Sequence, residues 1–321
     1  MKLFSWRRIL LIIALAMVFY FCMIVLSDLD DVIEAARQFN WLYILPVIGL
    51  VVGNYLLRSE RWHQYLRSIG LELPRKKSYW LFVSGLSMSI TPLKAGEAVK
   101  SVLLKMENDS PLERGVAVVF SERMSDIIGM ILLIAIGSIA LSYGLLSFVI
   151  IVVIVSVILL IIQMERLRVR LTDWLRTMKR LARLGGVIDN ACRDAKCMLS
   201  GRMLLLGTVL SVIAWAAECI AFFLIVAGSS AQISLLECTF IYAFSSVVGA
   251  VSMLPGGMGT TEATMVGLLA MLSVSVSAAS FAVILTRVST LWFAVAIGML
   301  FLAIYARRAP PSENNIFRKR T

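Results

Sequence analysis

The sequence has few of the side chains on which most enzymes and metal sites are built. Histidine occurs once, at His63, so a histidine-based catalytic triad has no candidate. Cys192 and Cys197 have no further partners at a zinc-like spacing, and we expect no metal site. The sequence has no Walker motif and no nucleophile elbow, and the glycines at 256–259 lie in no βαβ unit. We therefore predict neither a cofactor nor an enzymatic activity, and we expect His63 on the surface beside a membrane.

Long polar stretches are also absent. Hydrophobic residues make up 60% of the 321 residues, and the mean hydropathy is +0.88. Soluble domains contain about 45–50% apolar residues. No polar stretch is long enough to bury a core of its own. The composition therefore predicts an all-α polytopic membrane protein, with residues 1–321 forming a single integral membrane domain.

The net charge of +11 allows two interpretations, nucleic-acid binding and contact with a membrane surface. The basic residues are concentrated in loops between apolar stretches, above all at 164–202, and in the tail at 306–321. This placement is typical of cytoplasmic segments beside anionic lipid headgroups. We expect membrane lipid, and not nucleic acid, as the partner. The loop at 164–202 suits either an interfacial helix or a solvated segment.

Six stretches are long and apolar enough to cross a membrane. Lys2, Arg7 and Arg8 precede the first of them and place the N-terminus in the cytoplasm. The basic tail belongs on the same side, so we predict a multi-pass protein of the cell (inner) membrane with both termini cytoplasmic. The six predicted crossings are Ile9–Leu26, Trp41–Leu57, Val116–Ser142, Leu145–Gln163, Met203–Ala227 and Phe281–Tyr305.

The segment between the second and third crossings must leave the cytoplasm and return to it. The loop at 164–202 is cytoplasmic, so the third crossing, two helices earlier, must also start there. The first arm of the segment, Trp80–Thr91, has about 12 residues, or roughly 18 Å of helix against a core of about 30 Å. This arm is too short to cross, and Pro92 ends it. We predict a re-entrant hairpin with its tip near Pro92.

A second hairpin is predicted at Cys238–Leu272, with Pro255 near its tip. The fifth crossing ends outside and the last one returns inside, so this segment leaves and returns on the outer side. In both hairpins an arginine follows the proline, after 31 residues in the first (123 − 92) and 32 in the second (287 − 255). We predict two units in opposite orientation, about 41–142 and 203–305. This is an inverted repeat whose broken helices meet near the membrane midplane.

Charged side chains inside the predicted crossings indicate a site, because each costs roughly 2.5–3.5 kcal/mol at a helix centre. The half-helix after each break also presents free N–H groups to an anion. Pro92 and Pro255 are the predicted helix breakers, and Glu122 and Asp126 are candidates for proton or ion coupling. The candidate substrate-binding residues are Lys94, Gly96, Glu97, Arg123, Gly256, Gly257, Gly259, Glu262 and Arg287.

Two roles remain open for these charges. In the first, Arg123 and Arg287 hold an anionic headgroup, while carboxylates such as Glu97 and Glu262 carry protons or bind a cation. In the second, Arg123–Glu97 and Arg287–Glu262 are structural ion pairs that brace the hairpins. The glycines could likewise serve only close helix packing. Glu218 is expected to be a satisfied polar residue.

Four motifs, in this order, carry a family resemblance: "TPLKAGEAVKSVLLK", "SERMSDIIGM", "LPGGMGTTEA" and "ILTRVSTLWFAVAIGML". Together they resemble the membrane region of lysylphosphatidylglycerol synthases, which also occurs alone in flippase-like membrane proteins. Lys94 and Thr261 depart from the pattern, since relatives commonly carry an arginine near the first and often a basic residue at the second. In the synthases a separate soluble domain transfers the lysyl group. We expect no such domain here, so the resemblance argues against lysyl transfer.

The resemblance and the site together predict a flippase-like translocator of an anionic amphipathic substrate, such as a phospholipid or polyprenyl-phosphate conjugate. One alternative is a non-catalytic membrane partner that presents lipid to a glycosyltransferase or acyltransferase. A second alternative is a membrane-embedded lipid-modifying enzyme. The sequence names neither the substrate nor the oligomeric state.

Overall fold

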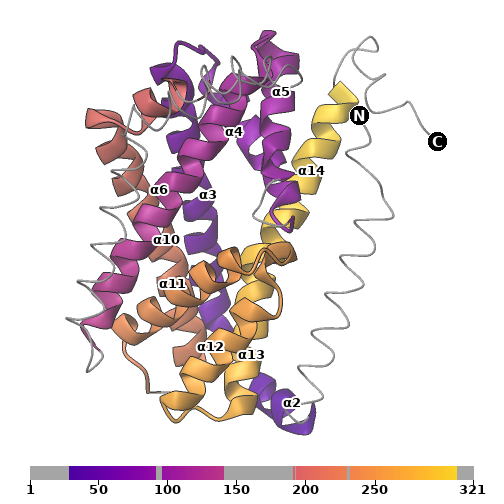
Figure 1. The fold of residues 1–321 in the computed structure, drawn as a ribbon. Coiled ribbons are helices and arrows are strands. Elements are labelled where there is room, and N and C mark those ends of the chain that lie inside the picture. The colour runs from indigo at the N-terminus through magenta and orange to yellow at the C-terminus, as the bar shows by residue number, and fades with distance from the viewer. Residues whose placement is uncertain (1–28, 92–95, 141–190, 192, 230–231, 309–321) are drawn as a thin grey trace.

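The computed structural model describes residues 29–91, 96–140, 191, 193–229 and 232–308. Every element with assigned bounds in this part of the chain is a helix, as the all-α prediction requires (Figure 1). The predicted crossings at 9–26 and 145–163 lie outside the described residues, as do Pro92 and Lys94.

The described helices fall into two successive series. The first series is α2 (Leu29–Gln38), η1 (Trp41–Tyr43), α3 (Ile44–Ser68), α4 (Arg75–Gly85), η2 (Leu86–Met88), α5 (Val99–Asn108) and α6 (Leu112–Ser138). The second is α10 (Gly201–Gly228), α11 (Leu235–Val251), η4 (Pro255–Gly257), α12 (Thr260–Met271), α13 (Val276–Arg287), the π-helix η5 (Val288–Trp292) and α14 (Phe293–Arg308).

Three helical stretches in the described part are long and apolar enough to cross a membrane. They are Trp41–Ser68, Gly201–Gly228 and Val276–Arg307. The 27-residue α6 overlaps the predicted crossing at 116–142, but it begins earlier, at Leu112. Three charged residues lie near its centre: Glu122, Arg123 and Asp126. The shorter α11 is apolar but has only 17 residues.

The second predicted crossing was too short, and the expectation for His63 was wrong. The helix α3 continues eleven residues beyond Leu57 to Ser68, and His63 is buried. The basic residues at 58–68 looked like a cytoplasmic loop, yet Arg58, Arg61 and Tyr65 follow a helical spacing and face the interior. Buried carboxylates on other helices compensate their charge, so the helix does not need to end where the basic residues start.

The segments predicted as hairpins contain α4, η2 and α5 in the first series and α11, η4 and α12 in the second. In Figure 1, α4 and α5 lie in the upper half of the bundle, whereas α11 and α12 lie in the lower half. The second turn bends through Gly256, Gly257 and Gly259, whose φ angles are 61°, 67° and 90°. Only glycine adopts this backbone conformation without strain, which explains the glycine-rich motif.

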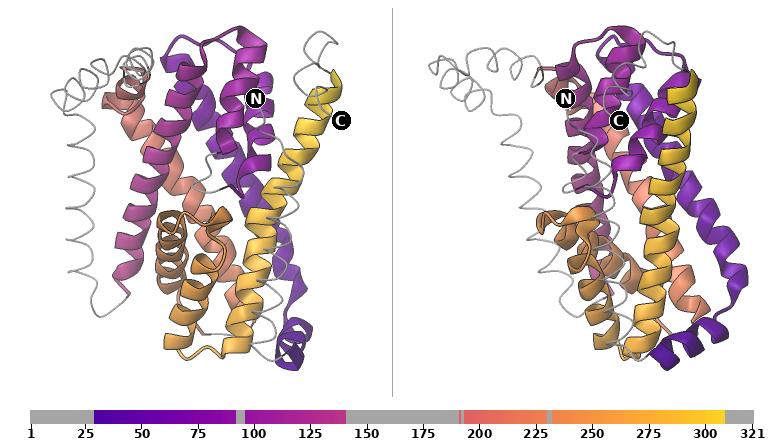
Figure 2. Two further views of the ribbon diagram at one scale, coloured as in Figure 1. Left: turned by 45° about the vertical axis from the view of Figure 1, so that its right-hand side comes forward. Right: turned by 90° about the vertical axis from the view of Figure 1, so that its right-hand side faces the viewer.

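The two series pack on each other in a crossed arrangement. The antiparallel helices α3 and α10 pack along each other at the centre. The first arm of each hairpin then packs on the last helix of the other series: α4 on α14, and α11 on α6 (Figure 2). A glycine lies at each of these helix contacts. A Cβ on Gly298 of α14 would lie 2.1 Å from Ser87 N of η2, which follows α4, and one on Gly137 of α6 would lie 2.5 Å from Phe240 N of α11.

The contact between α14 and η2 should therefore tolerate no side chain at position 298. We predict that Gly298→Ala lowers the melting temperature of the purified protein, because overpacking costs about 1–3 kcal/mol. The matched control is Gly53→Ala in α3, where a Cβ meets nothing within 4 Å and where alanine improves helix propensity. Equal melting temperatures for the two variants would contradict this packing.

Candidate functional site

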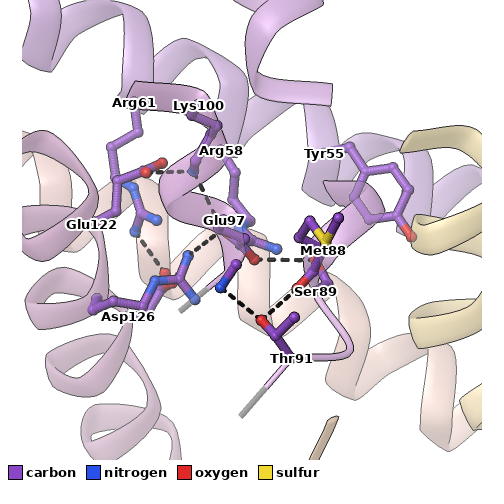
Figure 3. A network of polar contacts seen from close by, with 12 residues as sticks. Tyr55, Arg58, Arg61, Met88, Ser89, Thr91, Glu97, Lys100, Glu122 and Asp126 are labelled. Carbon is purple, nitrogen blue, oxygen red and sulfur yellow. Dashed lines mark hydrogen bonds and ion pairs between the residues drawn. The ribbon is translucent and has the colours of Figure 1, made fainter. Parts of the chain in front are cut away.

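Seven charged side chains from three parts of the chain meet at the tip of the first hairpin (Figure 3). Six of them are buried, and Arg123 is 20% exposed. We call them the first-tip cluster. Its members are Arg58 and Arg61 of α3, Glu97 and Lys100 at the start of the second hairpin arm, and Glu122, Arg123 and Asp126 of α6.

Glu97 is the centre of this cluster. Its carboxylate lies 3.0 Å from Arg123 Nη2, 3.2 Å from Lys100 Nζ and 3.9 Å from Arg58 Nη2. Ser89 Oγ donates a further hydrogen bond at 3.1 Å. Three cations from α3, α5 and α6 therefore converge on one hairpin carboxylate, which fixes the hairpin tip against both long helices.

Glu122 and Asp126, four residues apart on α6, bind different cations. Lys100 Nζ lies 2.6 Å from Glu122 Oε2, and Arg61 Nη1 lies 2.8 Å from Asp126 Oδ1. Trp215 Nε1 and Ser211 Oγ of α10 also donate to Asp126, at 2.9 and 3.2 Å. These carboxylates, predicted as coupling candidates, are thus held within a dense set of ion pairs.

The cluster contains four cations and three carboxylates, so one of its positive charges is not balanced by a carboxylate of the cluster. Aromatic rings cover part of this excess: Lys100 Nζ lies 4.6 Å from the Phe82 ring centroid, and the Arg58 guanidinium lies 5.6 Å from Phe82 and 5.5 Å from Trp215. In the described part of the chain, Arg58 Nε and Nη2 and Arg123 Nε are buried without a hydrogen-bond partner. Buried N–H donors in this state favour an anion.

The tip of the second hairpin carries a simpler group. Arg287 Nε donates to Glu262 Oε1 at 2.7 Å, and Arg287 Nη2 donates to the carbonyl of Gly256. The other Glu262 oxygen accepts the Gly259 N–H at 2.8 Å, at the N-terminus of α12. We call Gly256, Gly259, Glu262 and Arg287 the second-tip group.

Two glycine N–H groups, one in each half, are satisfied by side chains of this chain. Gly96 N–H donates to Thr91 Oγ1 at 2.7 Å, just as Gly259 N–H is bound by Glu262. Gly257 serves packing, because a Cβ there would lie 3.0 Å from Gly249 Cα. In this conformation the guanidinium groups, and not the glycine N–H groups, are the donors open to an anion.

The two tips touch through a small apolar contact. Ile90 of the first hairpin, Met258 of the second and Val295 of α14 form one buried cluster, with Trp292 packed against it. A Cβ on Gly256 would lie 3.5 Å from Ile90 Cγ1. The predicted site residues that the structure describes thus lie in two groups, which meet at this apolar contact.

The structure contains both ion pairs that the bracing interpretation predicts, Arg123–Glu97 and Arg287–Glu262. Three cations escaped the sequence analysis: Arg58, Arg61 and Lys100. Lys100 follows Glu97 by three residues, a helical spacing that could have identified it. Arg58 and Arg61 share a face of α3, but they were assigned to a loop.

Metal binding gains no support from the geometry. Among the residues that the structure describes, no group of three or more His, Cys, Asp and Glu side chains is placed to hold a metal ion. The buried carboxylates of the first-tip cluster are instead bound by arginine and lysine.

Comparison with known proteins identifies the family. The pattern of the lysylphosphatidylglycerol synthase TM region matches residues 9–298, which include both tips and the start of α14. The chain belongs to this family. It is also similar to two UPF0104 membrane proteins of Methanothermobacter thermautotrophicus. The first is 24% identical over 90% of this chain and 93% of the relative, and the second is 25% identical over 91% and 92%.

In this family member, the first-tip cluster should dominate stability. We predict that Lys100→Met costs about 3–5 kcal/mol in unfolding free energy, because it leaves Glu97 and Glu122 short of a buried cation. The matched control is Lys77→Met, since Lys77 lies 2.8 Å from Glu107 but is 60% exposed. An exposed pair contributes about 0–1 kcal/mol.

The measurement is denaturant unfolding in a lipid-like detergent, with Lys100→Met/Glu122→Gln as the double variant. Partial recovery in the double variant is expected, because the neutral amide removes one uncompensated charge. Similar losses for Lys100→Met and Lys77→Met would show that the cluster is not a buried ion-pair network.

Proposed function

We propose that the protein is a flippase-like membrane translocator of an anionic amphipathic substrate, such as a phospholipid or polyprenyl-phosphate conjugate. The observation that carries this proposal is the buried first-tip cluster, with one cation more than it has carboxylates. A negatively charged headgroup would complete its charge balance. Membership of the family supports a role in the membrane and, with it, a lipid substrate.

The headgroup binds between the tips, with Arg58 and Arg123 as its main donors in the first half. Both have buried guanidinium nitrogens without a hydrogen-bond partner in the described residues. Arg287 supplies the corresponding cation in the second half. The ion pairs with Glu97 and Glu262 then orient these arginines for the headgroup, so bracing and binding are two aspects of the same contacts.

The tail of the substrate stays in the membrane beside the second tip. Val251, Met253 and Leu254 are exposed apolar residues directly before Pro255. An amphipathic molecule can thus place its charge at the tips and its hydrocarbon on this surface. A small soluble anion would gain nothing from these three side chains.

The hairpins α4–α5 and α11–α12 are re-entrant, and residues 41–142 and 203–305 form an inverted repeat. The crossed packing of each first arm on the other unit's last helix supports this assignment. Rocking of the two units about the contact between Ile90 and Met258 would expose the tips to one side of the membrane and then the other. Both termini lie in the cytoplasm in this topology.

Lipid transport in proteoliposomes tests the proposal. We expect wild-type protein to move a fluorescent anionic phospholipid, and Arg123→Ala, Arg287→Ala and Glu262→Gln to reduce the rate about tenfold or more. A hydrogen bond to a charged group contributes about 1.5–3 kcal/mol, which corresponds to that factor. Arg75→Ala is the control, because its side chain is 62% exposed.

Each variant is checked for folding by its melting temperature. Equal rates in all folded variants would assign these charges to bracing alone. No transport by folded wild type across a broad lipid panel would overturn the proposal. Anionic lipid that still binds would then favour a partner that presents lipid to an enzyme.

A further inference from the structure

One buried carboxylate belongs to neither tip. Glu218 lies in α10, the most apolar of the three crossing stretches in the described part, and only 5% of its surface is exposed. A charged residue at the centre of such a helix costs roughly 2.5–3.5 kcal/mol and commonly marks an ion or proton pathway. The proposed translocation mechanism has not used this residue.

The structure shows a hydroxyl bound to this carboxylate. Tyr242 of α11 donates its hydroxyl hydrogen to Glu218 Oε2. A tyrosine hydroxyl can donate to a carboxylate and can equally accept a hydrogen bond from the neutral acid. An arginine or lysine, by contrast, has no acceptor and supports only the charged form. The contact with Tyr242 therefore remains satisfied whether Glu218 is charged or neutral.

The helix α3, which packs along α10, also contacts the last helical stretch. Asn54 Nδ2 of α3 donates to Ala214 O of α10, one turn before Glu218, at 2.8 Å, and the neighbouring Tyr55 hydroxyl donates to Thr290 O at 2.9 Å. Thr290 belongs to the π-helix that follows Arg287. Such wide turns occur frequently at functional sites. A change in charge at Glu218 thus acts at the point where unit one is attached to the helix that carries Arg287.

Other titratable and charged groups surround Glu218, and they come from α10 itself and from α3, α6, α11 and α13, which pack on it. They are Tyr55 and Arg58 of α3, Asp126 of α6 (bound to Trp215, three residues before Glu218), Cys219 of α10, Cys238 and Tyr242 of α11, and Arg287 of α13. The short helix η1 also contacts α10, but at its far end, near Gly228.

We propose that Glu218 is the proton-coupling site of the transporter, binding one proton in one conformation and releasing it in the other. This inference rests on the proposed function. The carboxylate takes a proton from water on one side and becomes a neutral acid that donates to the Tyr242 hydroxyl. Loss of its charge changes the field at Tyr55 and weakens the hold of unit one on the π-helix. Release of the proton on the other side restores the carboxylate.

The test uses reconstituted full-length protein with a pH difference of one unit across the vesicle membrane. For one proton per lipid, this difference can drive about tenfold accumulation of the labelled lipid. We expect wild type to show this dependence and Glu218→Gln to lose it, so that the ratio of rates with and without the gradient falls to about one. Glu34→Gln, which changes an exposed carboxylate of α2, should keep the wild-type ratio.

A second measurement does not depend on transport. Infrared difference spectra across a pH titration should show a protonated-carboxyl band that is absent from Glu218→Gln. In Tyr242→Phe the band should appear at higher pH, because the charged form has lost a hydrogen bond.

The outcomes separate the two proposals. Lipid flux in wild type without any pH-gradient effect, or with the same effect in Glu218→Gln, overturns the coupling role and leaves translocation intact. No flux in wild type overturns translocation. The infrared band then decides alone whether Glu218 exchanges a proton, and its persistence in Glu218→Gln refutes that.

Discussion

The arrangement of the first half depends on one carboxylate. Glu97 lies between α4 and α5, and one cation from each of α3, α5 and α6 forms an ion pair with it. Separately, each of these charges would be costly in an apolar bundle. Together they hold Glu97, at the start of the second arm, between α3 and α6. The second half solves the same problem with fewer groups, since Glu262 binds both Arg287 and the backbone of its own turn.

This difference between the halves matters for chemistry. The first tip has a surplus of positive charge and aromatic cover, whereas the second tip is an internally balanced pair beside an exposed apolar surface. The two halves therefore differ in charge balance and in the apolar surface beside them. Glu218 adds a carboxylate on the central helix of the second half, where α3 of the first half carries Arg58.

Length, apolar runs and charged loops were sufficient to predict an all-helical membrane protein. Pro255 and the glycines after it located the irregular turn between α11 and α12. The pairs Arg123–Glu97 and Arg287–Glu262 followed from matched spacing in the two halves. The end of α3 was predicted too early. A basic segment beside an apolar one shows the same sequence pattern whether it forms a loop or continues a buried helix. Only the positions of carboxylates on other helices distinguish these cases, and a single sequence does not supply them.

The π-helix in the last crossing changes how its two halves face the bundle. An α-helix turns about 100° per residue, so a wide turn with one extra residue rotates everything beyond it by about that angle. Arg287, before the wide turn, faces the second tip, while Gly298, after it, faces the backbone of η2. One continuous helical stretch can therefore direct Arg287 toward Glu262 and the Gly256 carbonyl, and Gly298 toward η2. The wide turn sets the angle between these two contacts.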